Sequence, residues 1–247
     1  IPDIDPTMVD GKEVWLRSNK SGKLNSLIWH GNNSQITENL LNQNFIDDDC
    51  KFCPDFLIVG AQKGGTTSAI PYLEQHFNIH MPFSEVHFFD EDDIYKRGLS
   101  WYEKRMNIPE NFEGLVGEKS PDYSVSLIAL ERIYYHCPDI KLIMFLRNPI
   151  LRAYSQWNMH VVGYDDEVDP DFLERGYEKR SFREVVDDDV SWEPLPNKWD
   201  IHNGSFYVRR GCYINQIEYI CKKFGRENLH IVISERTRDE SRLAKQY

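Results

Sequence analysis

The residues best suited to bind a phosphate group lie in a glycine-rich stretch, Gly60-Ala61-Gln62-Lys63-Gly64-Gly65-Thr66-Thr67-Ser68. Glycines let backbone N–H groups approach an anion closely, and the N-terminus of a following helix adds unpaired donors and a positive dipole end. Lys63 supplies a mobile cation, and the hydroxyl groups supply further donors. The stretch therefore predicts a phosphate-binding loop whose candidate residues are Lys63, Gly64, Gly65, Thr66, Thr67 and Ser68.

This loop differs from the P-loop, whose pattern is G-x-x-x-x-G-K-[ST]. Gly60 and Gly65 keep the glycine spacing, but Thr66 follows them and Lys63 lies inside the loop. A nucleoside triphosphatase needs that lysine on the β- and γ-phosphates and a metal-binding hydroxyl group after it. The pattern therefore disfavours ATP or GTP with magnesium. A glycine-rich turn without a ligand is the simpler alternative, and it requires the strand, glycines, lysine and hydroxyl groups to coincide by chance.

Arg147 and Ser155 form a second candidate anion site. Arg147 follows an apolar run from Ile140 to Leu146, and Ser155 lies in the helical stretch after it. The carboxyl ends of strands are where α/β sheets bind ligands, and an arginine with a serine can hold a terminal phosphate by charge-assisted hydrogen bonds. Taken alone, a capping arginine and a solvent-facing serine would explain the pair. Beside the first loop, the pair predicts a second phosphate site.

A carboxylate and an imidazole lie close together in the segment Glu85-Val86-His87-Phe88-Phe89-Asp90. In an extended segment Glu85 and His87 point to the same side, because side chains alternate along the backbone. Such a pair suits general-base chemistry, although an ordinary surface strand would carry the same residues.

Strands alternating with helices from Asp55 onward would position these side chains, and this order is typical of a parallel sheet. Strands are expected at Phe56 to Val59, from Leu115, at Ile140 to Leu146 and at Leu229 to Ile233. Helices are expected at Thr67 to Phe77, Trp101 to Met106, Ser126 to His136, Arg152 to about His160 and Tyr213 to Phe224. The predicted fold class is α/β, one domain built as a P-loop-like three-layer sandwich with a central parallel sheet flanked by helices.

The chain divides into an arm and a domain. Residues 1–52 are polar and weakly periodic, which favours an extended arm with a short helix over Ile36 to Leu41. Residues 53–247 would form the domain. Within it, residues 164–200 are strongly acidic, which is typical of a solvated excursion or a flap over the site.

Charge and cysteine content limit the partners. A net charge of -11 argues against nucleic acid or an anionic membrane surface as a general partner. No apolar run is long enough to span a bilayer, and the first residues do not form a signal peptide. Cys50 and Cys53 lack a second pair at ligand spacing, so we expect no metal site and either ordinary thiols or one disulfide. The cytoplasm is the favoured compartment, or the Golgi lumen if an upstream anchor was removed; the oligomeric state is left open.

Several motifs resemble those of the sulfotransferases that use 3′-phosphoadenosine 5′-phosphosulfate (PAPS). Lys63-Gly64-Gly65-Thr66-Thr67 after a strand resembles their 5′-phosphosulfate loop, and Arg147 with Ser155 resembles their 3′-phosphate motif. Glu85-Val86-His87-Phe88-Phe89 is similar to the Glu-x-His-Phe-Phe segment of heparan sulfate sulfotransferases and their bacterial relatives. The resemblance covers roughly residues 55–160 and, more faintly, 205–235. It implies that Glu85 deprotonates the acceptor, with His87 as its orienting partner.

Two further segments extend the resemblance. Glu118-Lys119-Ser120-Pro121-Asp122-Tyr123 looks like the Glu-Lys-[Ser/Thr]-Pro-x-Tyr segment that lines the acceptor side, which makes Lys119 a second candidate cation. In Arg209-Arg210-Gly211-Cys212-Tyr213, the residues Arg210 and Tyr213 would shape the nucleotide or acceptor pocket. The chain departs from the family at Thr67, where some members have an arginine, and in lacking a recognisable later glycine-rich loop.

The resemblance implies sulfuryl transfer from PAPS to a hydroxyl group or an amine, on family grounds a carbohydrate hydroxyl group. The acceptor would be a glycan or a small molecule, and no metal is expected. Two alternatives stay open: a P-loop-like small-molecule kinase, and a non-catalytic module that binds a nucleotide or a glycan.

Overall fold

Five parallel strands form the central sheet. In the computed structural model, the described residues are 7–9, 12–18, 24–28, 50–75, 78–162, 178–191 and 206–237. The strand order is β5-β6-β4-β7-β8, and every pairing is parallel. The strands are β4 (Phe56–Gly60), β5 (Ile79–His80), β6 (Leu115–Lys119), β7 (Lys141–Leu146) and β8 (Leu229–Ile233). The predicted α/β class with a parallel sheet is confirmed.

The position of β4 explains its composition. Its five residues are all buried, as expected for a strand covered on both faces. β4 pairs with β6 on one side and with β7 on the other. The chain therefore leaves β4 at a topological switch point, where α/β sheets bind ligands at the carboxyl ends of their strands.

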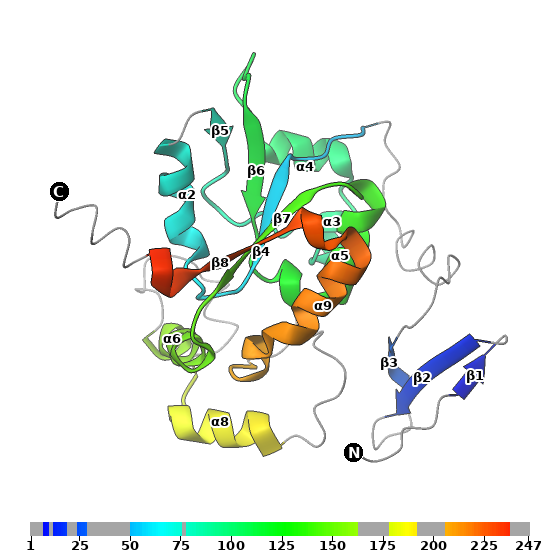
Figure 1. The fold of residues 1–247 in the computed structure, drawn as a ribbon, viewed down its shortest axis with the longest axis vertical. Helices are drawn as coiled ribbons and strands as arrows, with labels where there is room; N and C mark the ends of the chain where they lie inside the picture. Colours follow the sequence, from blue (N-terminus) through cyan, green and yellow to red (C-terminus); the bar gives the residue numbers. More distant parts are fainter. Residues whose placement is uncertain are drawn as a thin grey trace.

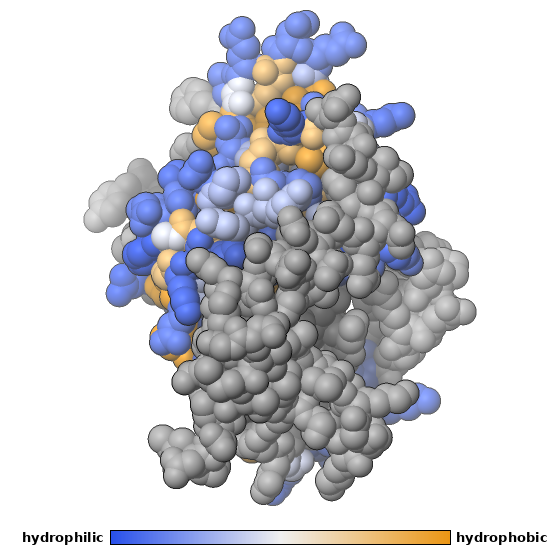
Figure 2. Space-filling view, turned by 90° about the vertical axis from the view of Figure 1, so that its right-hand side faces the viewer, coloured by the Kyte–Doolittle hydropathy of each residue, from blue (hydrophilic) through white to orange (hydrophobic). Residues whose placement is uncertain are grey.

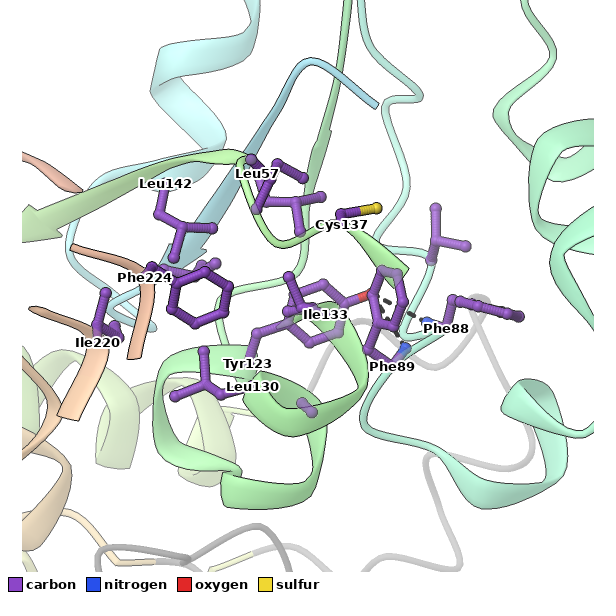
Figure 3. Packing of buried hydrophobic residues seen from close by; sticks show 14 of the residues in the cluster. Leu57, Phe88, Phe89, Tyr123, Leu130, Ile133, Cys137, Leu142, Ile220 and Phe224 are labelled. Atoms are coloured by element: carbon purple, nitrogen blue, oxygen red, sulfur yellow. Dashed lines mark hydrogen bonds between the residues drawn. The ribbon is translucent and has the colours of Figure 1, made fainter. Parts of the chain in front are cut away.

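Helices cover both faces of the sheet and make the three layers that the sequence predicts (Figure 1). One face packs on α2 (Thr66–Gln75) through Phe56, Ile58, Ala69 and Ile70. The other face carries the larger core, to which α4 (Leu99–Met106), α5 (Leu127–His136) and α9 (Tyr213–Phe224) contribute. Figure 3 shows part of this core, including Leu57, Leu130, Leu142, Ile220 and Phe224.

The remaining described helices are short or lie beside the carboxyl ends of the strands. They are α3 (Asp92–Tyr95), α6 (Pro149–Val162), α8 (Phe182–Ser191) and the 3-10 turns η1 (Tyr123–Val125), η2 (Arg209–Gly211) and η3 (Arg226–Asn228). α5 begins where Ser126 accepts a hydrogen bond from the Ala129 N–H, an N-cap at the residue where the sequence predicts the helix to start. Hydrophilic side chains dominate the described part of the face in Figure 2, and apolar residues gather toward its upper end.

The N-terminal region contains more regular structure than the sequence analysis expected. Three antiparallel strands lie there, β1 (Thr7–Val9), β2 (Lys12–Ser18) and β3 (Leu24–Ile28). Val9 pairs with Lys12, and the residues between them in the sequence are Asp10-Gly11, a pair typical of two-residue hairpin connections. The helix expected over Ile36 to Leu41 lies outside the described residues, and the boundary near residue 52 stays a prediction.

Part of the acidic segment 164–200 packs against the domain. Within its described residues, 178–191, the helix α8 buries Val185 and Asp189. The carboxylate of Asp189 accepts hydrogen bonds from the Val208 and Arg209 N–H groups and pairs with the Arg209 guanidinium. Most other residues of α8 are exposed, and both the solvated excursion over 164–200 and its role as a flap stay predictions.

Cys53 forms a disulfide with Cys137, and Cys50 is a free thiol. The sequence predicts ordinary thiols or one disulfide and gives no partner for Cys53. The described residues contain no group of three or more His, Cys, Asp or Glu side chains placed to hold a metal ion. Within the same residues, no helix has the length and apolar character that crossing a membrane requires.

Candidate active site

Three cations meet where neighbouring strands of the sheet end. Lys119 is the last residue of β6, Lys63 lies in the loop after β4, and Arg147 directly follows β7. Because β4 pairs with both β6 and β7 in parallel, these three strand ends lie side by side at one edge of the sheet. The cations therefore surround the beginning of α2.

The loop between β4 and α2 is shaped by its glycines. Gly65 has φ +107° and Lys63 has φ +62°, in the left-handed region that side chains rarely adopt. A Cβ atom at Gly64 would lie 2.6 Å from the Phe145 carbonyl oxygen, so only glycine fits against the end of β7. The Gly64 N–H donates to the Ala61 carbonyl at 2.8 Å. This bond engages one of the donors expected for the ligand, which leaves the N–H groups from Gly65 onward as candidates.

The hydroxyl residues occupy the first turn of α2, whose N–H groups have no acceptors within the helix. Thr66 is buried, whereas Thr67 and Ser68 are exposed. The Lys119 ammonium donates to Thr67 Oγ1 at 3.3 Å. Thr67 thus links the loop to the end of strand β6.

Lys63 and Arg147 lie close together without carboxylate partners among the described residues. The Lys63 ammonium donates to the thioether sulfur of Met159 at 3.6 Å, a weak acceptor. Arg147 donates to the Lys63 carbonyl at 3.3 Å, and its Nε is buried without a hydrogen-bond partner. Burial and the neighbouring Arg147 charge lower the pKa of Lys63. The negative charge of a bound anion would stabilise the charged forms of Lys63 and Arg147, so these residues suit a phosphate group.

The other residues predicted for the nucleotide differ in how available they are. Ser155 is half-buried on α6. Tyr213 donates to the Arg147 carbonyl at 2.9 Å, which brings it to the second anion site. Arg210 is buried and forms an ion pair with Asp122, so its charge is already compensated. Arg210 is therefore better suited to shape the site than to bind a ligand anion.

Glu85 lies at the centre of a chain of charged hydrogen bonds. One of its carboxylate oxygens accepts from the Lys119 ammonium at 2.6 Å, and the other is 3.2 Å from His87 Nε2. His87 Nδ1 lies 2.9 Å from the carboxylate of Asp90. The imidazole is thus held between two carboxylates, and Lys119 completes the group.

The protonation states follow from these contacts. Burial alone would lower the pKa of His87, but its bonds to Asp90 and Glu85 raise it to about 11. Burial would raise the pKa of Glu85, yet the donors His87 and Lys119 outweigh it and lower that pKa. At neutral pH, Glu85 is therefore ionised and His87 protonated. An ionised, partly exposed carboxylate can accept a proton.

Sequence reasoning did not assign a role to several residues of this site. Asp90, the partner of His87, is three residues after it, and Met159 follows Ser155 by one helical turn. Glu118 is fully buried and accepts hydrogen bonds from Tyr102, Ser120 and Tyr123. Burial raises the pKa of Glu118, and the three hydroxyl bonds act in the opposite direction. Its place inside a motif was the only available signal.

The fold and these side chains define an α/β protein in which a glycine-rich loop with a lysine lies beside an ionised carboxylate. The chain belongs to the sulfotransferase domain family, whose model matches residues 53–236.

Individual relatives agree with this assignment. The chain is 31% identical over 184 residues to heparan sulfate glucosamine 3-O-sulfotransferase 5 of Mus musculus, covering 74% of this chain and 48% of the relative. It is 43% identical over 105 residues to heparan sulfate glucosamine 3-O-sulfotransferase 6 of Homo sapiens, covering 42% of this chain and 30% of that protein. The chain spans about half the length of the first of these relatives and less of the second. A sulfotransferase crystal structure from Alicyclobacillus acidocaldarius matches 79% of both chains with a TM-score of 0.57 and 26% identity.

Proposed function

We propose that this chain transfers the sulfuryl group of PAPS to a hydroxyl group of a carbohydrate acceptor, or to an amine. Membership of the sulfotransferase domain family supports the reaction type, and the similarity to heparan sulfate glucosamine 3-O-sulfotransferases supports the acceptor class. The observation that carries the proposal is that Lys119 bonds both Glu85 and Thr67. A base and a phosphate-binding loop are thus joined through one cation.

The donor would bind along the ends of β4 and β7. The N–H groups from Gly65 to Ser68 and the Lys63 ammonium would hold the 5′-phosphate, and Arg147 with Ser155 would hold the 3′-phosphate. The buried Arg147 Nε without a partner and the weak Met159 contact of Lys63 support this assignment. Tyr213 would fix Arg147 through its carbonyl. Arg210 would support the pocket through Asp122.

Glu85 would take the proton of the acceptor as the acceptor oxygen forms its bond to sulfur. The bond between sulfur and the bridging oxygen of the 5′-phosphate breaks at the same time, and its electron pair stays on that oxygen. Lys63 would neutralise this growing charge, and Lys119 would hold the sulfonate oxygens. The products are the sulfated acceptor, a protonated Glu85 and adenosine 3′,5′-bisphosphate. Preorganised charges of this kind act where charge develops, without a metal.

The charges beside Glu85 favour a neutral acceptor group. The ammonium of Lys119 and the imidazolium of His87 balance the carboxylates of Glu85 and Asp90. A hydroxyl group adds no charge to this set, so its approach to Glu85 needs no further counterion. We therefore place a carbohydrate hydroxyl group ahead of a cationic small molecule.

The Cys53–Cys137 disulfide is relevant to the cellular compartment of the protein. Disulfides persist in oxidising compartments and are rare in the cytosol. The Cys53–Cys137 bond therefore supports the lumen of the secretory pathway rather than the cytoplasm. Labelling of free thiols in protein taken from its native source would reach three of the five cysteines of this sequence in the disulfide form and all five in the reduced form.

The test is an assay with sulfur-labelled PAPS against heparan-type oligosaccharides, neutral sugars and small amines. We expect label on the oligosaccharides, and strongly reduced transfer by Lys63→Ala and Glu85→Gln. Near-full activity in both variants would overturn the assignment. Calorimetric titration separates the kinase alternative, because a kinase would bind ATP with magnesium more tightly than adenosine 3′,5′-bisphosphate.

A further inference from the structure

We propose that Glu118 is a positioning residue, whose buried carboxylate holds the loop that carries Glu85 and His87. The inference rests on the proposed function, because it assigns Glu118 a part in the same reaction. Glu118 is fully buried, and its hydrogen-bond partners are Tyr102, Ser120 and Tyr123 rather than Glu85 or His87. Its effect would pass through two hydroxyl groups to the backbone of residues 86–89.

Both carboxylate oxygens of Glu118 accept hydrogen bonds from neighbouring hydroxyl groups. Ser120 Oγ donates to one oxygen at 2.5 Å, and the Tyr102 hydroxyl group donates to the other at 2.6 Å. The Tyr123 hydroxyl group lies 3.0 and 3.2 Å from the two oxygens. All three hydroxyl groups are donors, so the Glu118 carboxylate accepts a hydrogen bond from each of them.

Two of these hydroxyl groups also accept hydrogen bonds from the backbone of the loop formed by residues 86–89. Ser120 Oγ accepts from the N–H groups of Val86 at 3.2 Å and His87 at 3.0 Å. The Tyr123 hydroxyl oxygen accepts from Phe88 at 3.0 Å and Phe89 at 3.4 Å, and Figure 3 shows both bonds as dashed lines. Four consecutive N–H groups are therefore held by two hydroxyl oxygens. Each hydroxyl group has one hydrogen and donates it in a hydrogen bond to Glu118, so its lone pairs stay turned toward the loop.

The loop needs such partners because of its conformation. His87 has φ +53°, which is uncommon for any residue but glycine. Val86, Phe88 and Phe89 are buried, and buried N–H groups require acceptors. The rings of the same tyrosines hold the same loop: Phe88 stacks on Tyr102 with 4.5 Å between ring centroids, and Phe89 meets Tyr123 edge-on at 5.6 Å. Ring and hydroxyl contacts thus fix the one segment that carries the base.

Strand β6 holds the base from two sides. Glu118 and Lys119 are neighbours in this strand, so their side chains point to opposite faces. Lys119 bonds Glu85 directly, while Glu118 reaches it through Ser120 and the loop. A strand of the rigid sheet therefore sets the distance between the base and the phosphate-binding loop.

The experiment compares Glu118→Gln with Glu131→Gln in the full chain. Glu131 is the matched control, because it lies on α5 and also accepts from a phenol, that of Tyr219, and from the Lys223 ammonium. In Glu118→Gln an amide donor replaces an acceptor, and we expect kcat to fall about 10²-fold, as a displacement of about 1 Å can cause. The KM for PAPS and the affinity for adenosine 3′,5′-bisphosphate should stay unchanged. Glu131→Gln should keep kcat.

Milder variants cover the case in which Glu118→Gln does not fold. Ser120→Ala and Tyr123→Phe each remove one of the two hydroxyl groups and should lower kcat without weakening nucleotide binding, and Tyr219→Phe is the matched control. Unchanged kcat in the variants of Glu118, Ser120 and Tyr123 would overturn the inference. An equal loss of kcat and nucleotide affinity would also overturn it, since that pattern indicates general damage.

A readout without catalysis separates this inference from the proposed function. In the wild-type chain, Asp90 and Glu85 keep His87 protonated well above neutral pH against the opposing effect of burial, and Lys119 of β6 pairs with Glu85. Histidine NMR should show His87 losing its proton at lower pH in Glu118→Gln and not in Glu131→Gln. If the wild-type chain transferred no sulfuryl group while this shift appeared, the proposed function would fail and the positioning role would stand. If the wild-type chain were active and His87 did not shift, the positioning role would fail and the proposed function would stand.

Discussion

The donor side and the acceptor side of the site differ in how their charges are balanced. On the donor side, Lys63 and Arg147 have no ion-pair partner among the described residues, and they contact a thioether and a carbonyl. On the acceptor side, Glu85, His87, Asp90 and Lys119 form one continuous chain of ion pairs. The donor side leaves positive charge for a ligand to neutralise, while the acceptor side is electrically complete before any ligand binds.

This difference suggests what each side contributes. Uncompensated, partly buried cations gain most from binding an anion, so the donor side should govern nucleotide affinity. Compensated charges gain little from binding but can be held in a fixed geometry, so the acceptor side should govern the rate of the chemical step. Four substitutions test this division, in decreasing order of expected effect.

Glu85→Gln should have the largest effect. Loss of a positioned base lowers kcat by about 10²–10⁴-fold. Affinity for adenosine 3′,5′-bisphosphate should change much less than kcat, because Glu85 reaches the phosphate-binding loop only through Lys119. Steady-state kinetics and calorimetry measure the two quantities, with Glu74→Gln on the exposed face of α2 as control. A loss of nucleotide affinity as large as the loss of rate would abolish the distinction between the two sides.

Arg147→Ala should show the opposite pattern. Hydrogen bonds to charged groups contribute about 1.5–3 kcal/mol, so nucleotide binding should weaken by about 10- to 100-fold. At saturating PAPS, kcat should change much less. Arg147→Lys keeps the positive charge but loses the planar guanidinium. Its nucleotide affinity should lie between that of the wild-type chain and that of Arg147→Ala. Unweakened nucleotide binding in Arg147→Ala would contradict the second phosphate site.

His87→Asn should move the acidic limb of the pH–rate profile. His87 and Lys119 hold the pKa of Glu85 below its usual value, so Glu85 is ionised above that pKa and activity is lost as pH falls through it. Without the imidazolium the pKa of Glu85 rises, and the acidic limb should shift to higher pH. A profile of kcat from acidic to neutral pH measures this shift. A limb that stayed in place would show that His87 does not tune Glu85.

Ser155→Ala should have the smallest effect. A single hydrogen bond contributes about 0.5–1.5 kcal/mol, which corresponds to about a two- to tenfold loss of nucleotide affinity. Separate calorimetric titrations with adenosine 3′,5′-bisphosphate and with adenosine 5′-monophosphate test whether Ser155 binds the 3′-phosphate. The loss should appear only with the 3′-phosphate present, and an equal loss with both ligands would move Ser155 away from that phosphate.

Much of the fold was predictable because its elements have local causes. The apolar runs at Phe56 to Val59 and Ile140 to Leu146 are the central strands β4 and β7, and the helical spacing from Tyr213 to Phe224 is α9. The Asp10-Gly11 hairpin signal is equally local, although the polar composition around it favoured an extended arm. Pairings between distant residues were not predictable, since no spacing in the sequence relates Cys53 to its partner Cys137.

For the site, the motifs identified residue types but not their partners. Glu85 and Lys119 were predicted separately, and their 2.6 Å contact depends on how β6 and the preceding loop pack. Arg210 was predicted to shape the pocket, and nothing in the sequence indicated that its guanidinium pairs with Asp122, 88 residues away. Glu118 was visible only as a neighbour of Lys119. Buried networks join segments through side-chain geometry, which neither periodicity nor charge pattern encodes.

The double contact of Lys119 has one more consequence. Its ammonium is shared between Thr67, at the start of α2, and Glu85. A ligand that draws this ammonium toward Thr67 weakens its hold on Glu85, and the proton affinity of that carboxylate then rises. Under the proposed function, the strength of the base would therefore depend on whether the neighbouring loop is filled, so an acceptor that arrives before the nucleotide would meet a weaker base than one that arrives after it.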